Sequence, residues 1–262
     1  MDMSFLHLQD ITHIYFTTKS QTPALYDINF SLKEGEFVSI IGPSGCGKST
    51  LLSIISGLIR PTKGTVTIDG ETVRPGNKKT GYMLQQDYLF PWKTIEDNIF
   101  LGLKLNNRLN DTEKKETLRL LAKMGLHGVE KKYPTELSGG MRQRVALVRT
   151  LATKPKLLLL DEPFSALDFQ TKLKLEDLVF QTLKQFQKTA ILVTHDIGEA
   201  LAMSDRIYLL TNRPGTISQV FEVPKELREL LPFQVRSHPL YNEWFQLIWK
   251  ELENLERSLE SR

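Results

Sequence analysis

The sequence has very little cysteine and no long hydrophobic run. Its 262 residues include a single cysteine, Cys46, so an intramolecular disulfide is excluded, which is typical of a reducing compartment. Apolar runs such as Leu157 to Leu160 are far shorter than the roughly 18 residues that a membrane-spanning helix needs. The start, Met1 to Ser4, lacks the basic segment and apolar core of a secretory signal. We therefore expect a soluble cytoplasmic protein.

A strong charge of either sign is also missing. The net charge is only +3, and the lysines and arginines are scattered along the chain rather than clustered. This pattern is typical of a solvated surface of mixed charge, so we expect no nucleic-acid partner. The sequence has no internal repeat and no low-complexity tract, and 40% hydrophobic residues supply ample material for the core of an α/β domain.

The most informative stretch lies between residues 42 and 50. It follows a β-branched run, Phe37 to Ile41, that predicts a buried strand, and it precedes apolar residues at helical spacing from Lys48 to Gly57. A strand, a glycine turn and a helix form the context in which G-x-x-x-x-G-K-[ST] binds phosphate, as a Walker A motif. The predicted phosphate-binding residues are Gly42, Pro43, Ser44, Gly45, Cys46, Gly47, Lys48, Ser49 and Thr50.

The residue types of this loop suit a polyphosphate. Glycines let the backbone curl and present N–H donors where a Cβ would clash, and the helix adds the positive end of its dipole. Lys48 would place a mobile cation on the β- and γ-phosphates, and the Ser49 hydroxyl would ligate Mg²⁺. The alternative, a glycine turn that only caps a helix, is disfavoured by this context. No base lies near Cys46 in the sequence, so we interpret Cys46 as a small loop residue rather than a catalytic thiol.

Two acidic residues follow the most apolar run of the chain. Leu157 to Leu160 predicts a parallel strand buried on both faces, and Asp161 and Glu162 come directly after it. In open parallel sheets ligands bind beyond the carboxyl ends of the strands, so both acids would lie beside the phosphate-binding loop. Asp161 suits a role at Mg²⁺, and Glu162 suits a general base that deprotonates the attacking water. Taken alone, the pair also fits a strand-end turn with two solvated acids.

A third motif opens a helix predicted over Met141 to Ala152. Ser138, Gly139 and Gly140 precede it, so backbone N–H groups and the serine hydroxyl would form another anion site. The run LSGGMRQR that contains them resembles the signature of ATP-binding cassette (ABC) ATPases. The usual fifth residue of that signature is glutamine and not methionine, but the serine and both glycines are intact.

The resemblance to ABC ATPases covers residues 4 to about 220 and implies further site residues. Tyr15 resembles the aromatic residue that stacks on adenine, and Phe16 is the competing candidate. Gln85 resembles the Q-loop glutamine, which contacts Mg²⁺ or the attacking water. Gln86 is its alternative, but Gln85 directly follows the predicted strand.

Two further matches follow in the order that the family requires. Residues 165 to 168 resemble the D-loop, which would bring Asp168 to the nucleotide, and His195 resembles the switch histidine at the γ-phosphate. In the family the signature closes over ATP bound to the opposite subunit, so the resemblance implies a dimer. The implied cofactors are ATP and Mg²⁺. The implied catalytic residues are Lys48, Gln85, Glu162 and His195, and the implied metal ligands are Ser49, Gln85 and Asp161.

The resemblance also implies the architecture. We expect an α/β fold with a P-loop NTPase core (a RecA-like mixed sheet), an N-terminal antiparallel β subdomain and an α-helical subdomain. The ATPase domain is predicted over residues 4–223, with the helical subdomain at about 88–155. Within that subdomain, apolar spacing predicts a helix from Ile95 to Leu105, and Asp111 is a predicted N-cap. Residues 224–262 are predicted to form a C-terminal helical extension with one apolar face for packing on the domain or, alternatively, on a partner. That face consists of Tyr241, Trp244, Phe245, Ile248, Trp249, Leu252 and Leu255.

Two short segments point to a subfamily. Leu89 to Trp92 and Arg213 to Gly215 resemble the nitrate, sulfonate and taurine importer ATPases. The resemblance implies an energy-coupling subunit at the cytoplasmic face of the inner membrane. Its partners would be a second ABC ATPase subunit, two transmembrane permease subunits and, indirectly, an extracytoplasmic solute-binding protein. The solute would be nitrate-, sulfonate- or taurine-like, or a vitamin precursor.

Two alternatives to an importer subunit belong to other functional classes. A soluble ABC ATPase acting on ribosomes or DNA often fuses two cassettes, whereas this chain carries one Walker A motif and one signature. A P-loop kinase would lack the signature, the D-loop and the switch histidine.

Overall fold

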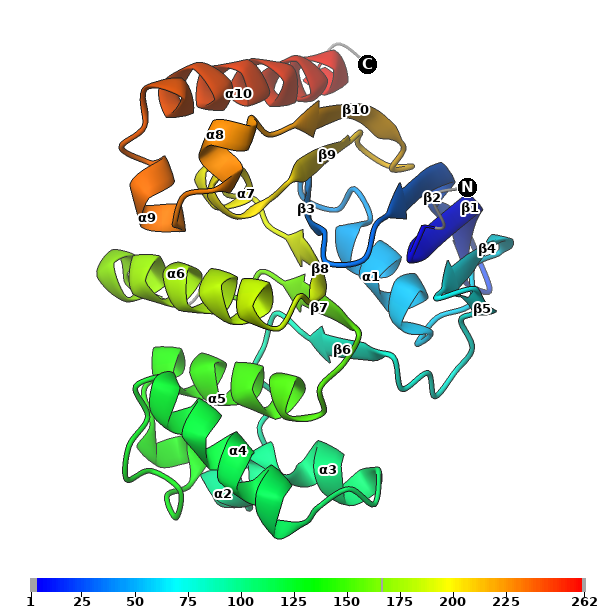
Figure 1. The fold of residues 1–262 in the computed structure, drawn as a ribbon. Coiled ribbons are helices and arrows are strands. Elements are labelled where there is room, and N and C mark those ends of the chain that lie inside the picture. Colours follow the sequence, from blue (N-terminus) through cyan, green and yellow to red (C-terminus); the bar gives the residue numbers. More distant parts are fainter. Residues whose placement is uncertain (1–3, 166, 261–262) are drawn as a thin grey trace.

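The computed structural model describes residues 4–165 and 167–260, and Figure 1 shows their arrangement. An antiparallel sheet of order β2-β1-β4-β5 lies beside a six-stranded sheet of order β10-β9-β3-β8-β7-β6. In the larger sheet every adjacent pair is parallel except β10 and β9. The predicted mixed sheet and antiparallel subdomain are therefore confirmed.

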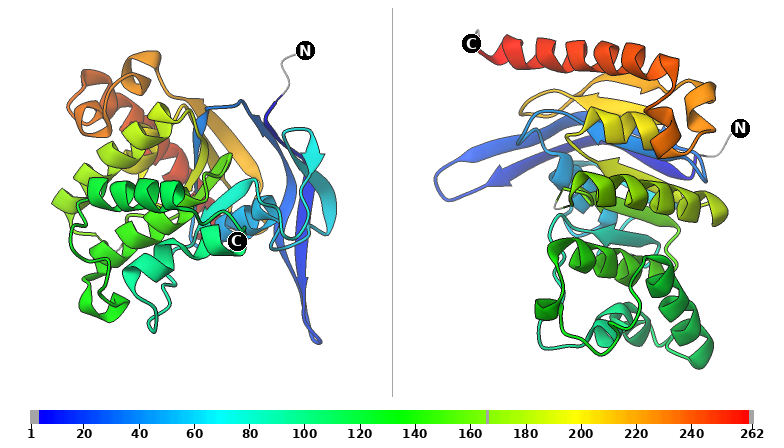
Figure 2. Two further views of the ribbon diagram at one scale, coloured as in Figure 1. Left: turned by 60° about the horizontal axis from the view of Figure 1, so that its bottom comes forward. Right: turned by 90° about the vertical axis from the view of Figure 1, so that its left-hand side faces the viewer.

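The antiparallel sheet is dominated by one long hairpin. Leu6 of β1 pairs with Leu32 of β2, and apolar side chains of β1 such as Leu8 and Ile11 are buried while their neighbours face outward. Figure 2 shows this hairpin reaching beyond the central sheet and its helices. Strand β1 continues to Phe16, so Tyr15 lies within it near its end. The strands are β1 (Leu6–Phe16), β2 (Gln21–Leu32), β4 (Lys63–Ile68) and β5 (Glu71–Thr72).

The central sheet places the predicted site residues in a row. Every residue of β3, β7 and β8 is buried, which explains their almost continuous apolar sequence. The neighbouring strands β3, β8, β7 and β6 end at the same edge, just before the Walker loop, His195, Glu162 and Gln85. The strands are β3 (Phe37–Ile41), β6 (Thr80–Met83), β7 (Leu157–Asp161), β8 (Thr189–Val193), β9 (Arg206–Leu210) and β10 (Ile217–Glu222).

Helix α1 (Lys48–Ser56) packs between the two sheets. Its Leu51, Leu52 and Ile54 share a buried cluster with apolar residues of β1 and of β3. On the opposite face of the central sheet, α5 (Gly139–Ala152) and α6 (Phe169–Gln185) cover β7 and β8 in a second cluster. The two clusters thus cover both faces of the central sheet, and the Walker loop joins the cluster formed with α1 through Cys46.

The helical region differs from the prediction in two places. The expected helix from Ile95 to Leu105 is divided at Phe100, which ends α2 and begins α3. Asp111 was expected to cap the next helix, but the cap is Asn110, whose Oδ1 accepts a hydrogen bond from Glu113 N at 2.9 Å. A negative charge is favourable both at the cap and in the first turn, so the pattern did not distinguish the two positions. The elements are α2 (Ile95–Ile99), α3 (Leu101–Leu105), α4 (Asp111–Lys123), a 3₁₀ turn (Pro134–Glu136) and α5 (Gly139–Ala152).

The C-terminal extension packs on the rest of the chain. Ile248 of α10 is completely buried in a third cluster with residues of α7 and β10, and the predicted apolar face contributes to it. Trp249 departs from that prediction, because it is half-exposed and stacks on Phe245 instead. No helix of the described residues is long and apolar enough to cross a bilayer. The elements are α7 (Ile197–Met203), α8 (Lys225–Arg228), α9 (Pro232–Val235) and α10 (Pro239–Glu260).

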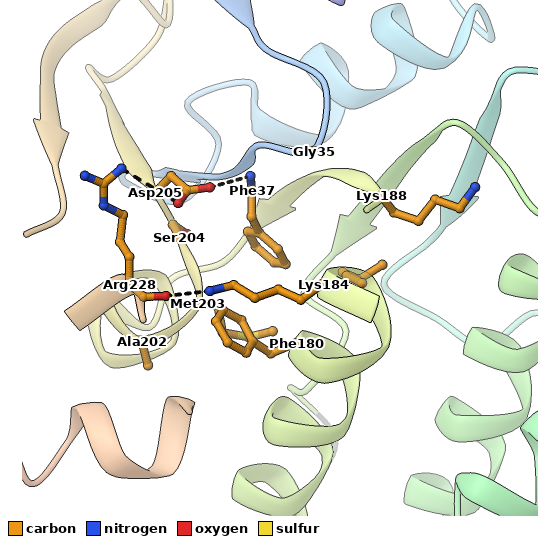
Figure 3. A pocket seen from close by; sticks show the side chains of 11 residues that line it. Gly35, Phe37, Phe180, Lys184, Lys188, Ala202, Met203, Ser204, Asp205 and Arg228 are labelled. Atoms are coloured by element: carbon orange, nitrogen blue, oxygen red, sulfur yellow. Dashed lines mark hydrogen bonds and ion pairs between the residues drawn. The ribbon is translucent and has the colours of Figure 1, made fainter. Parts of the chain in front are cut away.

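A small cavity marks one contact between the extension and α6 (Figure 3). Lys184 Nζ donates to Arg228 O at 2.6 Å, and Phe37 N donates to Asp205 Oδ2 at 2.9 Å. Farther along α6, Asp177 Oδ1 accepts from the backbone of α9 at 2.9 Å. The cavity volume is about 30 Å³, which suits a water molecule and not a nucleotide. The contacts of Lys184 and Asp177 thus hold the extension along α6.

Candidate active site

The Walker loop has the backbone of an anion-binding turn. Gly45 and Gly47 have φ angles of 78° and 103°, a region that favours glycine. A Cβ on Gly47 would lie 2.7 Å from Leu25 Cδ2, so the loop also needs glycine there for packing. No side chain caps α1, which leaves its first N–H groups available to an anion.

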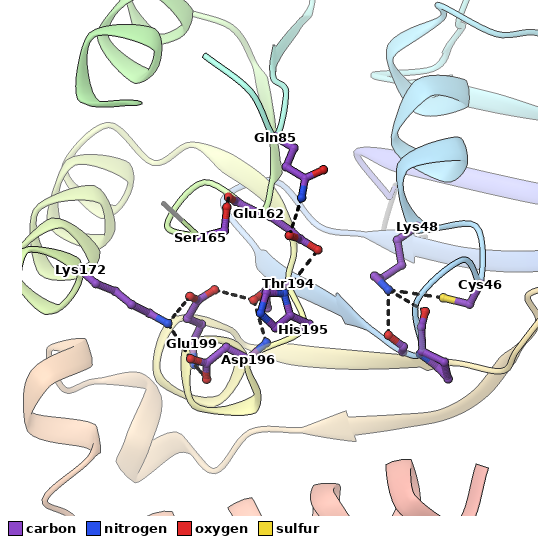
Figure 4. Close-up of polar contacts among 12 residues, drawn as sticks. Cys46, Lys48, Gln85, Glu162, Ser165, Lys172, Thr194, His195, Asp196 and Glu199 are labelled. Atoms are coloured by element: carbon purple, nitrogen blue, oxygen red, sulfur yellow. Dashed lines mark hydrogen bonds and ion pairs between the residues drawn. The ribbon is translucent and has the colours of Figure 1, made fainter. Parts of the chain in front are cut away.

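Lys48 is held inside this loop. Its buried Nζ donates to Gly42 O at 2.8 Å and to Pro43 O at 2.9 Å (Figure 4). It also approaches Cys46 Sγ at 3.7 Å. Burial raises the pKa of the Cys46 thiol, which supports its interpretation as a neutral loop residue. The carbonyl groups thus keep the ammonium group at the place where phosphate oxygens would arrive.

The segment after β9 contacts the same loop directly. Gly215 N donates to Ala24 O at 2.9 Å, and a Cβ on Gly215 would overlap the carbonyl oxygen of Cys46. Arg213 Nε donates to Gly45 O at 3.3 Å. The sequence Arg213 to Gly215, noted above only as a subfamily resemblance, therefore packs directly on the Walker loop.

Oxygen atoms that could bind a divalent cation lie near Lys48. Asp161 is buried at the end of β7 and accepts from Tyr82 Oη at 3.2 Å. Burial raises the pKa of Asp161, and the nearby Ser49 and Tyr82 hydroxyl groups oppose that rise. Within the described chain no group of three or more His, Cys, Asp and Glu side chains could hold a metal by itself. This donor set fits Mg²⁺, which commonly takes one or two protein oxygens and completes its shell with water and substrate phosphates.

Glu162 joins the other predicted catalytic residues. Gln85 Nε2 donates to Glu162 Oε2 at 2.8 Å, and His195 Nδ1 lies 3.4 Å from Glu162 Oε1. The backbone of Glu162 has a φ angle of 48°, and its N–H donates to Val193 O at 2.8 Å. Strained backbone at such a position is common in active sites. It is Gln85, and not the exposed Gln86, that contacts the carboxylate.

Both adenine-stacking candidates lie at the end of β1. Tyr15 Oη is 3.2 Å from Thr50 Oγ1, in the first turn of α1, and its ring packs edge-on against His13. Tyr15 is 40% exposed and Phe16 is 62% exposed. The contact with Thr50 places Tyr15 next to the Walker loop, while both rings keep an accessible face.

The signature and D-loop residues form hydrogen bonds with the helices that follow them. Ser138 Oγ caps α5 by accepting from Met141 N at 3.3 Å, and Asp168 caps α6 by accepting from Thr171 N at 3.0 Å. A Cβ on Gly140 would lie 2.7 Å from Leu167 Cδ2, which brings the two motifs together. The described parts of the chain show no hydrogen bond from either cap to the Walker loop. Residue 166 of the predicted D-loop lies outside the described residues.

Sequence reasoning missed a set of buried and partly buried charges near His195. We call it the switch cluster, and it joins two helices, the turn after β8 and the C-terminal extension. A signal was present in the sequence, because a glutamate interrupts the apolar helix that follows His195. The switch cluster consists of Lys172, Glu176, Asp196, Glu199 and Arg236.

The switch cluster predicts a pH dependence of stability. Glu176 is completely buried, and burial raises its pKa from 4.5 to about 7 although Arg236 opposes the rise. A carboxyl group with a raised pKa binds more protons in the folded state, so its contribution to the unfolding free energy falls as pH rises from about 4.5 to 7. The quantity to compare is the unfolding free energy of the wild type minus that of Glu176→Gln. We expect this difference to fall by on the order of 2 kcal/mol between pH 5 and pH 8.

Chemical denaturation of both proteins across this pH range measures that difference. Taking the difference removes the contribution of His13, whose pKa burial lowers and which acts in the opposite direction. A difference that stays constant from pH 5 to pH 8 would contradict the assignment to Glu176.

Comparisons with known proteins agree with this geometry. A family model described as ABC transporter matches residues 25–165. The chain is 62% identical to the uncharacterized ABC transporter ATP-binding protein YtlC of Bacillus subtilis, over 97% of the chain and 98% of the relative. It is 46% identical to the aliphatic sulfonates import ATP-binding protein SsuB of Bacillus cereus, over 79% of the chain and 82% of the relative.

A solved structure shares the fold. It is described as the dimeric, post-hydrolysis state of an ATP-binding cassette bound to ADP and Pi, and it superposes with a TM-score of 0.75 at 34% identity. The match covers 84% of this chain and 99% of the solved one. With a family model that spans more than half of its length and relatives that match most of it, the chain belongs to the ABC transporter family, as an ATP-hydrolysing ATP-binding cassette.

Proposed function

We propose that the chain is the energy-coupling subunit of an importer and hydrolyses ATP at the cytoplasmic face of the inner membrane. The observation that carries this function is the convergence of Gln85 and His195 on Glu162, beside the loop that holds Lys48. The sulfonate-import name of the SsuB relative supports an importer of a small solute, with nitrate-, sulfonate- or taurine-like anions and vitamin precursors as candidates.

ATP binding follows from the Walker loop. Its N–H groups and the N-terminus of α1 face the phosphates, and Lys48 exchanges two carbonyl oxygens for phosphate oxygens of higher negative charge. Ser49 and Asp161 would hold Mg²⁺, with Gln85 nearby, and the bound ion would neutralise charge on the β- and γ-phosphates.

Glu162 then acts on the attacking water. It takes a proton from that water while the water oxygen forms a bond to the γ-phosphorus, and the bond to the bridging oxygen of ADP breaks. Gln85 and His195 each contact one carboxylate oxygen, so they fix the direction in which Glu162 faces. His195 also supplies a polar group close to the transferring phosphoryl group.

A second cassette completes the site. Ser138, Gly139 and Gly140 form the N-terminus of α5, and Asp168 lies at the start of the adjacent α6. In a dimer both would face ATP bound to the other subunit. The dimeric state named for the solved relative supports this arrangement.

The adenine contact leads to a prediction. We expect Tyr15→Ala to weaken ATP binding about 10-fold, because stacking of a base on an aromatic ring is worth roughly 1–3 kcal/mol. Phe16→Ala should change the affinity less than 2-fold, since Tyr15 is the ring that contacts the first turn of α1. Titration with a fluorescent ATP analogue measures both. The reverse order of the two effects would assign the stacking to Phe16.

The surface after β6 suits a membrane partner. Tyr88 and Trp92 are largely exposed just beyond Gln85, and the ring of Trp92 contacts Phe90 with centroids 5.2 Å apart. Arg149 donates to the carbonyl oxygens of Asp87 and Tyr88 at 2.6 and 2.8 Å, so the segment is held firmly. We place the two permease subunits here and over the adjacent helices of residues 88–130.

Co-purification tests the proposed function. The tagged full chain, extracted gently from native membranes, should be recovered with a polytopic permease, and a solute-binding protein should stimulate ATP hydrolysis by that complex. Recovery with ribosomes or DNA and without a permease would contradict the importer and leave the ATPase assignment intact.

A further inference from the structure

We propose that the C-terminal extension positions the switch histidine, because Arg236 of α9 completes the switch cluster that fixes the turn carrying His195. The inference rests on the proposed role of His195 in hydrolysis. It assigns to residues 224–262 a function in the catalytic cycle of their own chain.

His195 depends on its backbone for orientation. Its side chain is 68% exposed, and its contact with Glu162 is a long one at 3.4 Å. The neighbouring backbone is firmly held, since Thr194 Oγ1 donates to Glu199 Oε2 at 2.5 Å and accepts from Asp196 N at 3.0 Å. Asp196 Oδ1 in turn accepts from Glu199 N at 3.1 Å. The direction of the imidazole therefore follows from this turn.

Lys172 connects the turn to α6. Its Nζ lies 2.6 Å from Asp196 Oδ2 and 2.5 Å from Glu199 Oε1, and its side chain is largely buried (Figure 4). Helix α6 begins at the D-loop cap, Asp168. One ammonium group thus joins α6 to the turn that carries His195.

Arg236 pairs with Glu176, so Lys172 remains paired with the turn that carries His195. Glu176 lies one helical turn after Lys172, is completely buried, and meets Arg236 Nη1 at 2.8 Å. Glu199 raises the pKa of the Glu176 carboxyl group, and Lys172 lowers it. Without Arg236, an ionised Glu176 would be a buried charge with no adequate partner, and it would draw Lys172 away from the turn.

The rest of the extension holds Arg236 in place. The backbone of α9 donates to Asp177 of α6 at 2.9 Å, and Arg236 Nη1 donates to Pro232 O at 3.0 Å. In α10, Tyr241 packs against the start of α7, where a Cβ on Gly198 would lie 2.7 Å from Tyr241 Oη. The charged groups that act on Glu176 from these elements are thus Arg236, Glu199 and Lys172, and the Tyr241 hydroxyl lies close to the same carboxyl group.

Steady-state ATP hydrolysis by Arg236→Met tests the positioning. We expect kcat to fall about 3- to 10-fold at pH 8.5, within the range typical of coupling to a site through other residues, and KM for ATP to change less than 2-fold. The deficit should shrink toward pH 6.5, because Glu176 is then protonated and no longer competes for Lys172. A matched control, Arg257→Met, removes an exposed ion pair with Glu253 on α10 and should leave kcat unchanged.

A double variant distinguishes a positioning effect of Arg236 from a folding defect of the Arg236→Met protein. Adding Glu176→Gln to Arg236→Met removes the unpaired carboxylate, so kcat should return to within 2-fold of the wild type at every pH. If Arg236→Met does not fold, Arg236→Lys provides the same comparison, with a smaller deficit that changes in the same direction with pH.

The outcomes distinguish this inference from the function on which it rests. If His195→Ala hydrolyses ATP at the wild-type rate, the proposed role of His195 is wrong. If His195→Ala is inactive but Arg236→Met matches the wild type from pH 6.5 to pH 8.5, the positioning by the extension is wrong. A pH-independent loss in Arg236→Met that Glu176→Gln does not restore would also overturn it.

Discussion

Replacing Glu162 with glutamine is expected to lower kcat about 10²- to 10⁴-fold, the contribution typical of a general base, while ATP still binds. Glutamine preserves the shape of the side chain and its contacts with Gln85 and His195, but it cannot accept the proton of the attacking water. Rapid-quench measurement of phosphate release gives kcat, and equilibrium titration with ATP gives the affinity. Glu222→Gln, at an exposed position of β10, is the control.

The same variant tests the assembly. Since ATP would persist in the Glu162→Gln site, we expect a stable dimer in the presence of ATP and Mg²⁺, measured by light scattering after size exclusion. A variant that remains monomeric at high protein concentration would argue against the role of Ser138 and Gly140 in the opposite subunit. Rapid turnover by Glu162→Gln would exclude Glu162 as the base.

Lys48→Ala is expected to weaken ATP binding by about 10- to 10³-fold, since hydrogen bonds between charged groups are worth roughly 1.5–3 kcal/mol each. The ammonium group is buried and already directed into the loop, so its loss removes the only charge that the Walker motif offers to the β- and γ-phosphates. Isothermal titration with ATP and Mg²⁺ measures the change.

Lys48→Arg makes this second test more specific. The guanidinium group keeps the charge but is larger and planar, and Gly42 and Pro43 enclose the position closely, so the variant should bind ATP nearly as weakly as Lys48→Ala. The exposed Lys63 supplies a control, Lys63→Ala, that should bind normally. Unchanged affinity in Lys48→Ala would refute the phosphate-binding role.

The arrangement of the candidate site was largely predictable because its residues follow buried strands. The runs before the Walker loop, before Asp161 and before His195 are short and apolar, and such strands lie parallel with their carboxyl ends at one edge. That rule alone brings Lys48, Glu162 and His195 close together. The direct contact of Gln85 with Glu162, and the preference over Gln86, needed the coordinates.

Other features depend on contacts that no local pattern encodes. Lys172 and Arg236 are far apart in the sequence, and the burial of Glu176 between them results from the docking of α9 on α6. Phe100 divides a stretch whose periodicity predicts one helix, and Trp249 shares the spacing of the buried stripe yet faces outward. In each case tertiary packing decided among conformations that the sequence allowed.

The third buried cluster restricts how this molecule can be shortened. Leu209, Phe221 and Val223 belong to the cassette, yet they are covered by Leu227, Val235 and Ile248 of the extension. A chain that stopped at residue 223 would expose an apolar patch beside the edge strand β10, a combination that favours self-association. If such a truncated chain were insoluble, the cause would be its uncovered core, and the result would carry no information on catalysis. Single substitutions at the contact between the extension and the cassette can provide that information.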